Sequence, residues 1–204
     1  MQRSRMHNPE SASLMSALET LKDVLYEANI KFAVIGGLAF GHYVEIRGTK
    51  DIDIIIATKG VSDATEVFNL LQGAGFRPAT KESGKLQIGH LDDIKAYTLA
   101  FWGPSPLQVR VDVIASMDEF YNVAVSEAEY DEKFGVHIVP LEAFIVLKAA
   151  SLRARIVSSD PETRRRGIQD NADYEFLIAA PNIDKNKLRW YSTQLGVPLD
   201  RIDL

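Results

Sequence analysis

The strongest constraint on the fold of this chain is an apolar run that contains two aspartates, Asp51-Ile52-Asp53-Ile54-Ile55-Ile56. Side chains alternate between the two faces of a β-strand, so residues two apart point the same way. Asp51 and Asp53 therefore share one face of the predicted strand, and Ile52, Ile54 and Ile56 can be buried on the other. Two carboxylates held this close repel each other and raise a pKa unless a cation lies between them. The pattern favours a hard divalent metal, above all Mg²⁺, which binds carboxylate and phosphate oxygens.

A glycine pair, Gly36 and Gly37, precedes these acids between a predicted strand over 32–35 and a predicted helix over 38–44. Glycine lets the backbone approach a bulky ligand, and the first N–H groups of a helix lack partners within the helix. Such N–H groups favour phosphate. Taken alone, the pair is explained equally well by a tight turn without a ligand. Close to two acids a phosphate site is the better interpretation, because Mg²⁺ is commonly bound by carboxylates and substrate phosphates together.

A third acid, Asp112, lies in the apolar segment 109–114. An unpaired charge in such a strand is costly. We expect Asp112 to meet Asp51 and Asp53 from another strand and to complete a site for two divalent ions about 3.5–4 Å apart. The alternative is an ion pair with Arg110, which lies on the same face of the strand two residues earlier.

Hydrophobic periodicity predicts an α+β fold. Apolar residues at helical spacing predict helices over 9–28, with a start at Asn8-Pro9 and a stop at Asn29, and over 38–44, 63–72, 141–155, 162–180 and 184–195. Short apolar runs predict strands over 32–35, 51–56, 85–88, 94–101, 107–114 and 136–139. The change from strands to helices near Pro140 predicts an α/β core, residues 1–140, and a helical C-terminal region, residues 141–204, that packs on it.

Composition excludes several classes of protein. The chain has no cysteine, so a disulfide framework, a thiolate zinc site and a cysteine nucleophile are excluded. No apolar run approaches the roughly 18–20 residues that cross a bilayer, and the basic residues at the start lack the apolar stretch of a secretory signal. We therefore expect a cytoplasmic protein without membrane contact. The net charge of −5 argues against sequence-independent binding of duplex DNA.

Together these residues resemble the nucleotidyltransferase superfamily of the DNA polymerase β type, in particular its small bacterial members: minimal nucleotidyltransferases, antibiotic nucleotidyltransferases and AbiEii-like toxins. The family pattern is a hydrophobic residue, Gly-Gly or Gly-Ser, a spacer, Asp-x-Asp and a later strand Asp. Here it reads Ile35-Gly36-Gly37, Asp51-Ile52-Asp53 and Asp112. Glycine at position 37 lacks the hydroxyl that a serine would offer to phosphate. The resemblance implies a nucleotidyltransferase-type mixed β-sheet flanked by helices and followed by a C-terminal helical region.

The resemblance also implies a reaction, the transfer of a nucleoside monophosphate from an NTP to an acceptor hydroxyl on RNA, a protein or a small molecule. Asp51 and Asp53 would bind Mg²⁺ or Mn²⁺, Asp112 would share the second ion and help to deprotonate the acceptor, and Gly36 and Gly37 would hold phosphates. The alternatives are a non-catalytic relative that binds nucleotide or a partner chain, and an antibiotic nucleotidyltransferase with a deep pocket and extra acids. An AbiEii-like toxin would have an RNA acceptor and an antitoxin partner.

Three further residues are candidates for nucleotide binding. Arg47 and Thr49 precede the acids in a lead-in that resembles the Arg-x-Thr-x-Asp-x-Asp form of the family, although both could be ordinary loop residues. Lys148 lies on the apolar stripe of the predicted helix over 141–155. Its ammonium either points at the triphosphate and the acids or extends to the surface. AbiEii-like proteins carry a lysine in a comparable helix, which favours the nucleotide.

Some charged and aromatic groups receive the simpler interpretation. Arginines gather at 153, 155 and 164–166, as expected for solvated helix ends, although an RNA acceptor would also use them. Asp170 and Asp173 resemble acids that follow this arginine segment in AbiEii-like chains, and they either pair with it or lie at the surface. Phe101 and Trp102 are expected in the core or at its rim rather than as a platform for bases.

Overall fold

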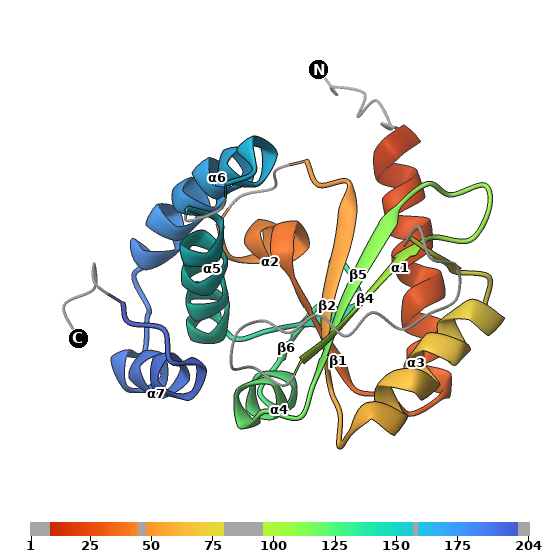
Figure 1. The fold of residues 1–204 in the computed structure, drawn as a ribbon, viewed down its shortest axis with the longest axis horizontal. Helices are drawn as coiled ribbons and strands as arrows, with labels where there is room; N and C mark the ends of the chain where they lie inside the picture. Colours follow the sequence, from red (N-terminus) through yellow and green to blue (C-terminus); the bar gives the residue numbers. More distant parts are fainter. Residues whose placement is uncertain (1–8, 45–47, 80–95, 157–158, 200–204) are drawn as a thin grey trace.

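The computed structural model describes residues 9–44, 48–79, 96–156 and 159–199 (Figure 1). The helices are α1 (Pro9–Glu27), α2 (Gly36–Tyr43), α3 (Val61–Gly73), α4 (Glu119–Ser126), α5 (Leu141–Ile156), α6 (Pro161–Ile178) and α7 (Lys185–Leu195). The strands are β1 (Phe32–Ile35), β2 (Asp51–Ala57), β3 (Arg77–Pro78), β4 (Ala96–Trp102), β5 (Arg110–Ser116), β6 (Glu129–Asp131) and β7 (Val136–Ile138). This is the α+β fold that the sequence predicts, a mixed sheet flanked by helices.

The strands form one sheet in the order β3-β4-β5-β2-β1-β7-β6. The pairs β2–β5 and β1–β7 are parallel, and the other neighbours are antiparallel. β2 and β5 are far apart in sequence but adjacent in the sheet. The topology therefore brings the strand of Asp51 and Asp53 beside the strand of Asp112.

Helices lie on both sides of this sheet, with α1 and α3 on one side and α2, α5 and α6 on the other (Figure 1). The apolar stripe of α1 is buried, and Phe68 of α3 contacts Phe101 of β4 at a ring-centroid distance of 5.5 Å. Buried residues of the sheet, α1, α5, α6 and α7 belong to one continuous hydrophobic core. The C-terminal helices thus pack on the same core as the sheet, and their separation as a unit at residue 140 stays a prediction.

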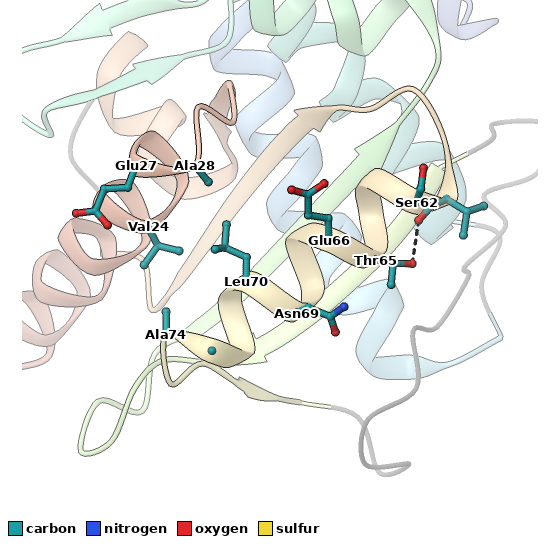
Figure 2. Close-up of a pocket in the computed structure, with 11 residues that line it drawn as sticks. Val24, Glu27, Ala28, Ser62, Thr65, Glu66, Asn69, Leu70 and Ala74 are labelled. Carbon is teal, nitrogen blue, oxygen red and sulfur yellow. Dashed lines mark hydrogen bonds between the residues drawn. The ribbon is translucent and has the colours of Figure 1, made fainter.

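A broad groove of about 1090 Å³ separates α1 from α3. Figure 2 shows Val24 of α1 and Leu70 of α3 facing each other across it, with Glu27 and Glu66 nearby. No residue of the predicted nucleotide site lines this groove. This groove is therefore separate from the acids of β2 and β5.

Several elements differ from the sequence expectations for clear reasons. The sequence did not predict β3 or β6. These strands have two and three residues, which is too short to show the alternation of buried and exposed side chains. The sequence did not predict the helix α4, because its eight residues are rich in aromatic and β-branched side chains, which favour strands. β5 starts at Arg110 rather than 107, because Gly103 N–H donates to the Val109 carbonyl at 2.8 Å and closes the preceding segment as a loop. The strand predicted over 85–88 lies outside the described residues. Among the helices in the described part, none has the length and apolarity to span a membrane.

Candidate active site

Asp51 and Asp53 lie on the face of β2 that is only partly buried. The strand alternates at its start, with these two side chains half-buried and Ile52 and Ile54 fully buried. Because successive side chains on one face are two residues of about 3.3 Å apart, the two carboxylates begin roughly 7 Å from each other. The strand thus places two partly exposed acids side by side on one face of the sheet.

Asp112 joins them from β5. In the parallel β2–β5 ladder Asp112 is the direct partner of Asp53, and Arg110 is the direct partner of Asp51. Paired residues on neighbouring strands, about 4.8 Å apart, point to the same face. The structure therefore brings the three acids together on one patch.

Burial and repulsion strongly perturb this patch. Loss of solvent is the largest cause that raises the pKa of Asp53 to about 7, and repulsion from Asp51 and Asp112 adds to it. Burial also raises the pKa of Asp112, while the guanidinium of Arg110 acts in the opposite direction. A bound cation would relieve both effects, because it favours the ionised carboxylates.

The glycine pair closes directly over these residues. Gly36 is the first residue of α2 and has a φ of 66°, which glycine adopts without strain. A Cβ at Gly36 would lie 2.7 Å from Cγ of Asp53, and a Cβ at Gly37 would lie 2.6 Å from Oγ1 of Thr49. The pair thus lets the start of α2 approach the acids, with the unpaired N–H groups of its first turn at the same place.

The variant Gly36→Ala is expected to destabilise the protein by at least about 2 kcal/mol, because a left-handed backbone costs a non-glycine residue about 1–2 kcal/mol and the Asp53 side chain must also move. The matched variant Gly48→Ala should have little effect, since no heavy atom lies within 4 Å of a Cβ there. Urea unfolding of both variants measures the difference. Equal stabilities of the two variants would contradict both expected costs, that of the left-handed backbone at position 36 and that of moving Asp53.

Thr49 positions Asp51 in this structure. Its hydroxyl donates to Oδ1 of Asp51 at 2.7 Å and also lies 3.2 Å from the Asp51 carbonyl oxygen. Thr49 is therefore more than a loop residue, since it orients one of the acids. Arg47 lies outside the described residues.

Arg110 is paired with Asp112, as the alternative interpretation of the sequence required. Its Nε donates to both carboxylate oxygens at 3.0 and 2.9 Å. Within the described ranges, no three acidic or histidine side chains already form a finished metal-binding group. Three carboxylates on two paired strands nevertheless fit Mg²⁺ by their chemistry. Binding at Asp112 would require Arg110 to release that carboxylate.

Lys148 is buried between α5 and α6 and is already paired. Its Nζ donates to Asp170 at 3.0 Å and to Asp173 at 2.8 Å, and Arg155 also binds Asp170. Lys148 and Arg155 still lie close enough to Asp53 to act against the rise in its pKa. The two acids thus pair with the basic residues of α5 rather than lying at the surface, and phosphate binding by Lys148 stays a prediction.

Arg166, His42 and His137 each have a partner outside the acid patch. Arg166 pairs with Glu162 at 3.3 Å in the first half of α6, and its charge acts against the rise in the pKa of Asp112. His42 is hydrogen-bonded to Asp131 at 2.5 Å, and His137 to Tyr26 at 3.1 Å. Neither histidine belongs to the acid patch.

The sequence predicted Trp102 in the core or at its rim but did not predict which strand residues lie opposite it. Phe101 is buried in the core, but Trp102 on the next position of β4 is 39% exposed. Trp102 is the strand partner of Arg110, and Ala100 is the strand partner of Asp112. That Phe101 and Trp102 point to opposite faces follows from their being neighbours in a strand. How near they lie to the acids depends on the pairing of β4 with β5.

Known proteins share the fold of this chain. The sequence matches no protein-family model and no curated protein. Among solved structures, ANT(2'')-Ia in complex with adenylyl-2''-tobramycin aligns with a TM-score of 0.51 and 13% identity, over 90% of this chain and 97% of that one. An antigenic nucleotidyltransferase-like protein from Paracoccidioides brasiliensis has a TM-score of 0.51 and 19% identity, over 91% and 87% of the chains.

The Megavirus polyadenylate synthase gives a TM-score of 0.52 at 13% identity, over 89% of this chain and 34% of that one. At these identities the likeness to all three is a likeness of fold. This chain has the fold of the nucleotidyltransferases.

Proposed function

We propose that this protein is a metal-dependent nucleotidyltransferase that moves a nucleoside monophosphate from an NTP to an acceptor hydroxyl. The observation that carries the proposal is the pairing of Asp53 with Asp112 in the β2–β5 ladder, with Asp51 on the same face. The pKa of Asp53, raised to about 7, supports it, because strongly perturbed acids gather at functional sites. The approach of Gly36 to Asp53 adds a phosphate-binding backbone at the same place.

The residues would divide the reaction among them. Asp51 and Asp53 would hold Mg²⁺ or Mn²⁺, which neutralises charge on the triphosphate when bound. N–H groups of Gly36 and Gly37 would bind phosphate oxygens. Asp112 would orient the acceptor hydroxyl and take its proton while the hydroxyl oxygen forms a bond to the α-phosphorus. The bond from that phosphorus to pyrophosphate breaks, and the protein contributes mainly position and charge.

The finer assignment is to the AbiEii-like toxins, whose lysine helix and following acids resemble α5 and α6. In its support, Lys148 and both acids, Asp170 and Asp173, form one buried cluster here. A toxin of this kind would act in the cytoplasm on RNA and would be neutralised by an antitoxin protein. Arg47, Thr49 and Lys148 would then contribute to the NTP site.

The test uses each α-labelled NTP with Mg²⁺ or Mn²⁺ and total cellular RNA, and measures label transfer and pyrophosphate release. The double variant Asp51→Ala, Asp53→Ala should lose at least about a thousandfold in rate, which corresponds to ~4 kcal/mol of transition-state stabilisation. NTP with Mg²⁺ should also raise the melting temperature of the wild type by mass action. The double variant should lose this shift.

The matched control is Asp23→Ala, Glu27→Ala, which removes two exposed acids from α1. It should retain both label transfer and the melting shift. Equal transfer by wild type and the Asp51, Asp53 variant would overturn the proposal. A melting shift with NTP and Mg²⁺ but no transfer to RNA, protein or small-molecule hydroxyls would favour a non-catalytic relative that binds nucleotide.

A further inference from the structure

The face of α6 that points away from the hydrophobic core is exposed and contains apolar side chains. On the inner face Asp170, Asp173 and Leu177 are buried. The opposite face, which we call the outer stripe, consists of residues at alternating spacings of four and three: Pro161, Arg165, Ile168, Ala172, Glu175 and, at the C-cap, Ala179. Among the described residues, Ile168 at 73% and Phe176 at 62% are the most exposed large hydrophobic side chains. Figure 1 shows α6 at the periphery of the fold, where a second molecule can reach this stripe.

The outer stripe reads the same in both directions along the helix. Its steps are 4, 3, 4, 3 and 4 residues, so an antiparallel second α6 centred on position 170 would set each position against another member of the stripe. Ile168 would meet Ala172 of the second copy. The turn that contains Arg164 and Arg165 would meet the turn that contains Glu175. The stripe is therefore complementary to its own copy in spacing and in charge.

The distribution of charge on α6 favours the antiparallel arrangement. Arg166 pairs with Glu162 of the same helix at 3.3 Å, so Arg164 and Arg165 carry the positive charge at this end of the stripe. Parallel helices would place these arginines against their own copies, and like charges in contact disfavour association. Antiparallel helices place them against Glu175, which is exposed near the other end of α6. The acid that complements the arginines thus belongs to the same helix, which favours a second copy of this chain over an unrelated acidic partner.

A hollow beside the outer stripe gives the second copy a place to pack. Its volume is about 520 Å³, and it lies between α5 and the first half of α6, lined by residues that include Leu152, Arg164 and Ile168. The second half of an antiparallel α6, with its Glu175, would lie over this hollow. Because α6 has 18 residues and is about 27 Å long, the contact is small, and interfaces below about 1,200 Å² belong to weak complexes. The structure thus suits a dimer that forms only as the protein concentration rises.

We propose that the outer stripe of α6 is the interface of a homodimer, in which two copies of this chain pair their α6 helices antiparallel. The interface is isologous, so each contact occurs twice. Arg164 of one copy binds Glu175 of the other, and Ile168 packs against Ala172. The inference does not depend on the transfer reaction, because the outer stripe points away from the charged cluster between α5 and α6.

Sedimentation velocity and light scattering of the full chain, from about 5 to 500 µM, measure the association. We expect the dimer to increase with concentration, with a dissociation constant on the order of 10–100 µM, as suits a small interface. Ile168→Asp should weaken association at least about tenfold, because it sets a carboxylate of each copy near the two-fold axis. The matched control is Val61→Asp, which makes the same kind of change at an exposed apolar position of α3 and should associate like the wild type.

Charge reversal tests which residues face each other. Glu175→Arg and Arg164→Glu should each weaken association at least about tenfold, because symmetry turns two attractive pairs into two repulsive ones. The two changes combined should restore most of the wild-type affinity. Neither change should harm α6 itself, since an acid in the first turn and a base in the last turn suit the helix dipole, and thermal unfolding checks this. Arg189→Glu on α7 is the control for charge and should leave association unchanged.

The absence of cysteine from the chain allows a test of orientation with single thiols. Positions 161 and 179 are about 27 Å apart along one α6, but they meet between antiparallel copies. A short bis-maleimide should therefore cross-link a mixture of Pro161→Cys and Ala179→Cys, and should cross-link neither variant alone. Cross-linking of each variant with itself would indicate parallel helices and would overturn the arrangement.

Three other results would overturn the inference. The first is a wild type that remains monomeric at the highest concentration. The second is a combined charge reversal that associates as weakly as the single changes. The third is a dimer that Val61→Asp disrupts and Ile168→Asp does not, which would place the interface on another face. A monomeric wild type that binds an oligoglutamate peptide or a single-stranded RNA through Arg164 would assign the outer stripe to that partner instead.

Discussion

Asp53→Asn is expected to make the protein more stable at pH 8, by about 2–4 kcal/mol. Burial and two neighbouring carboxylates raise the pKa of Asp53 from 3.8 to about 7 in the folded state, and each pKa unit corresponds to about 1.4 kcal/mol. At pH 8 the carboxylate is ionised in both states, but only the folded state holds it beside Asp51 and Asp112. Asparagine keeps the shape and removes the charge.

The sign of the pH dependence follows from the same shift. A group with a raised pKa in the folded state binds its proton more tightly there, so the wild type gains stability as the pH falls from about 7 towards 4. Below about pH 4 the Asp53 carboxyl is neutral in both states, and the advantage of Asp53→Asn should disappear. Above about pH 7 the full difference should remain.

Urea unfolding without divalent ions, at pH 8, 6 and 4, measures this difference. The control is Asp23→Asn, which makes the same chemical change at an exposed position of α1 and should shift stability by less than about 0.5 kcal/mol. An Asp53→Asn protein that is less stable than wild type at pH 8 would show that a cation or hydrogen bonds already stabilise this carboxylate. A gain that does not vary with pH would exclude its ionisation as the cause.

Lys148→Met is expected to destabilise the protein by about 3–5 kcal/mol. Removal of one partner from a buried ion pair leaves the other charge in the interior without compensation. Here the ammonium of Lys148 binds Asp170 and Asp173, whose side chains are only 6% and 1% exposed. Arg155 and Ser151 still bind Asp170 after the change, so Asp173 bears most of the loss.

A second variant identifies the cause of this loss. Lys148→Met with Asp173→Asn removes one charge of each sign and should recover about half of the lost stability. Lys187→Met is the matched control, because Lys187 pairs with Glu127 at 3.1 Å on the surface and such pairs contribute about 0–1 kcal/mol. Thermal and urea unfolding of the three variants test this order. Equal losses in Lys148→Met and Lys187→Met would contradict it.

The sequence predicts two of the three acids of the patch, because the alternation of side chains along one strand places Asp51 and Asp53 on the same face. Alternation along 51–56 places Asp51 and Asp53 on one face, where both are half-buried, while Ile52 and Ile54 between and after them are fully buried. The place of Asp112 required more than periodicity. It depends on the parallel pairing of β2 with β5, which lie more than fifty residues apart in the chain and have no local signal for their register.

The charged cluster between α5 and α6 could be predicted only in part from the sequence. The apolar stripe of α5 indicates that Lys148 is buried, and its partners lie 22 and 25 residues later on another helix. Charge counts name Asp170 and Asp173 as candidates, but only the packing of α5 along α6 selects them. The strand β3, which contains Arg77, could not be predicted from the sequence, because two residues show no alternation of side chains.

The order of strands separates the acids of β2 and β5 from aromatic and basic side chains nearer one edge of the sheet. β2 and β5 carry the acids in its interior, whereas Trp102 and Arg77 lie on β4 and β3 towards one edge. A one-residue shift of β2 would turn its acids into the core, so the interior strands tolerate little change. β4 has the same constraint, because its exposed Trp102 alternates with the buried Phe101. Substitutions that keep this alternation are therefore tolerated better than any insertion or deletion within β2.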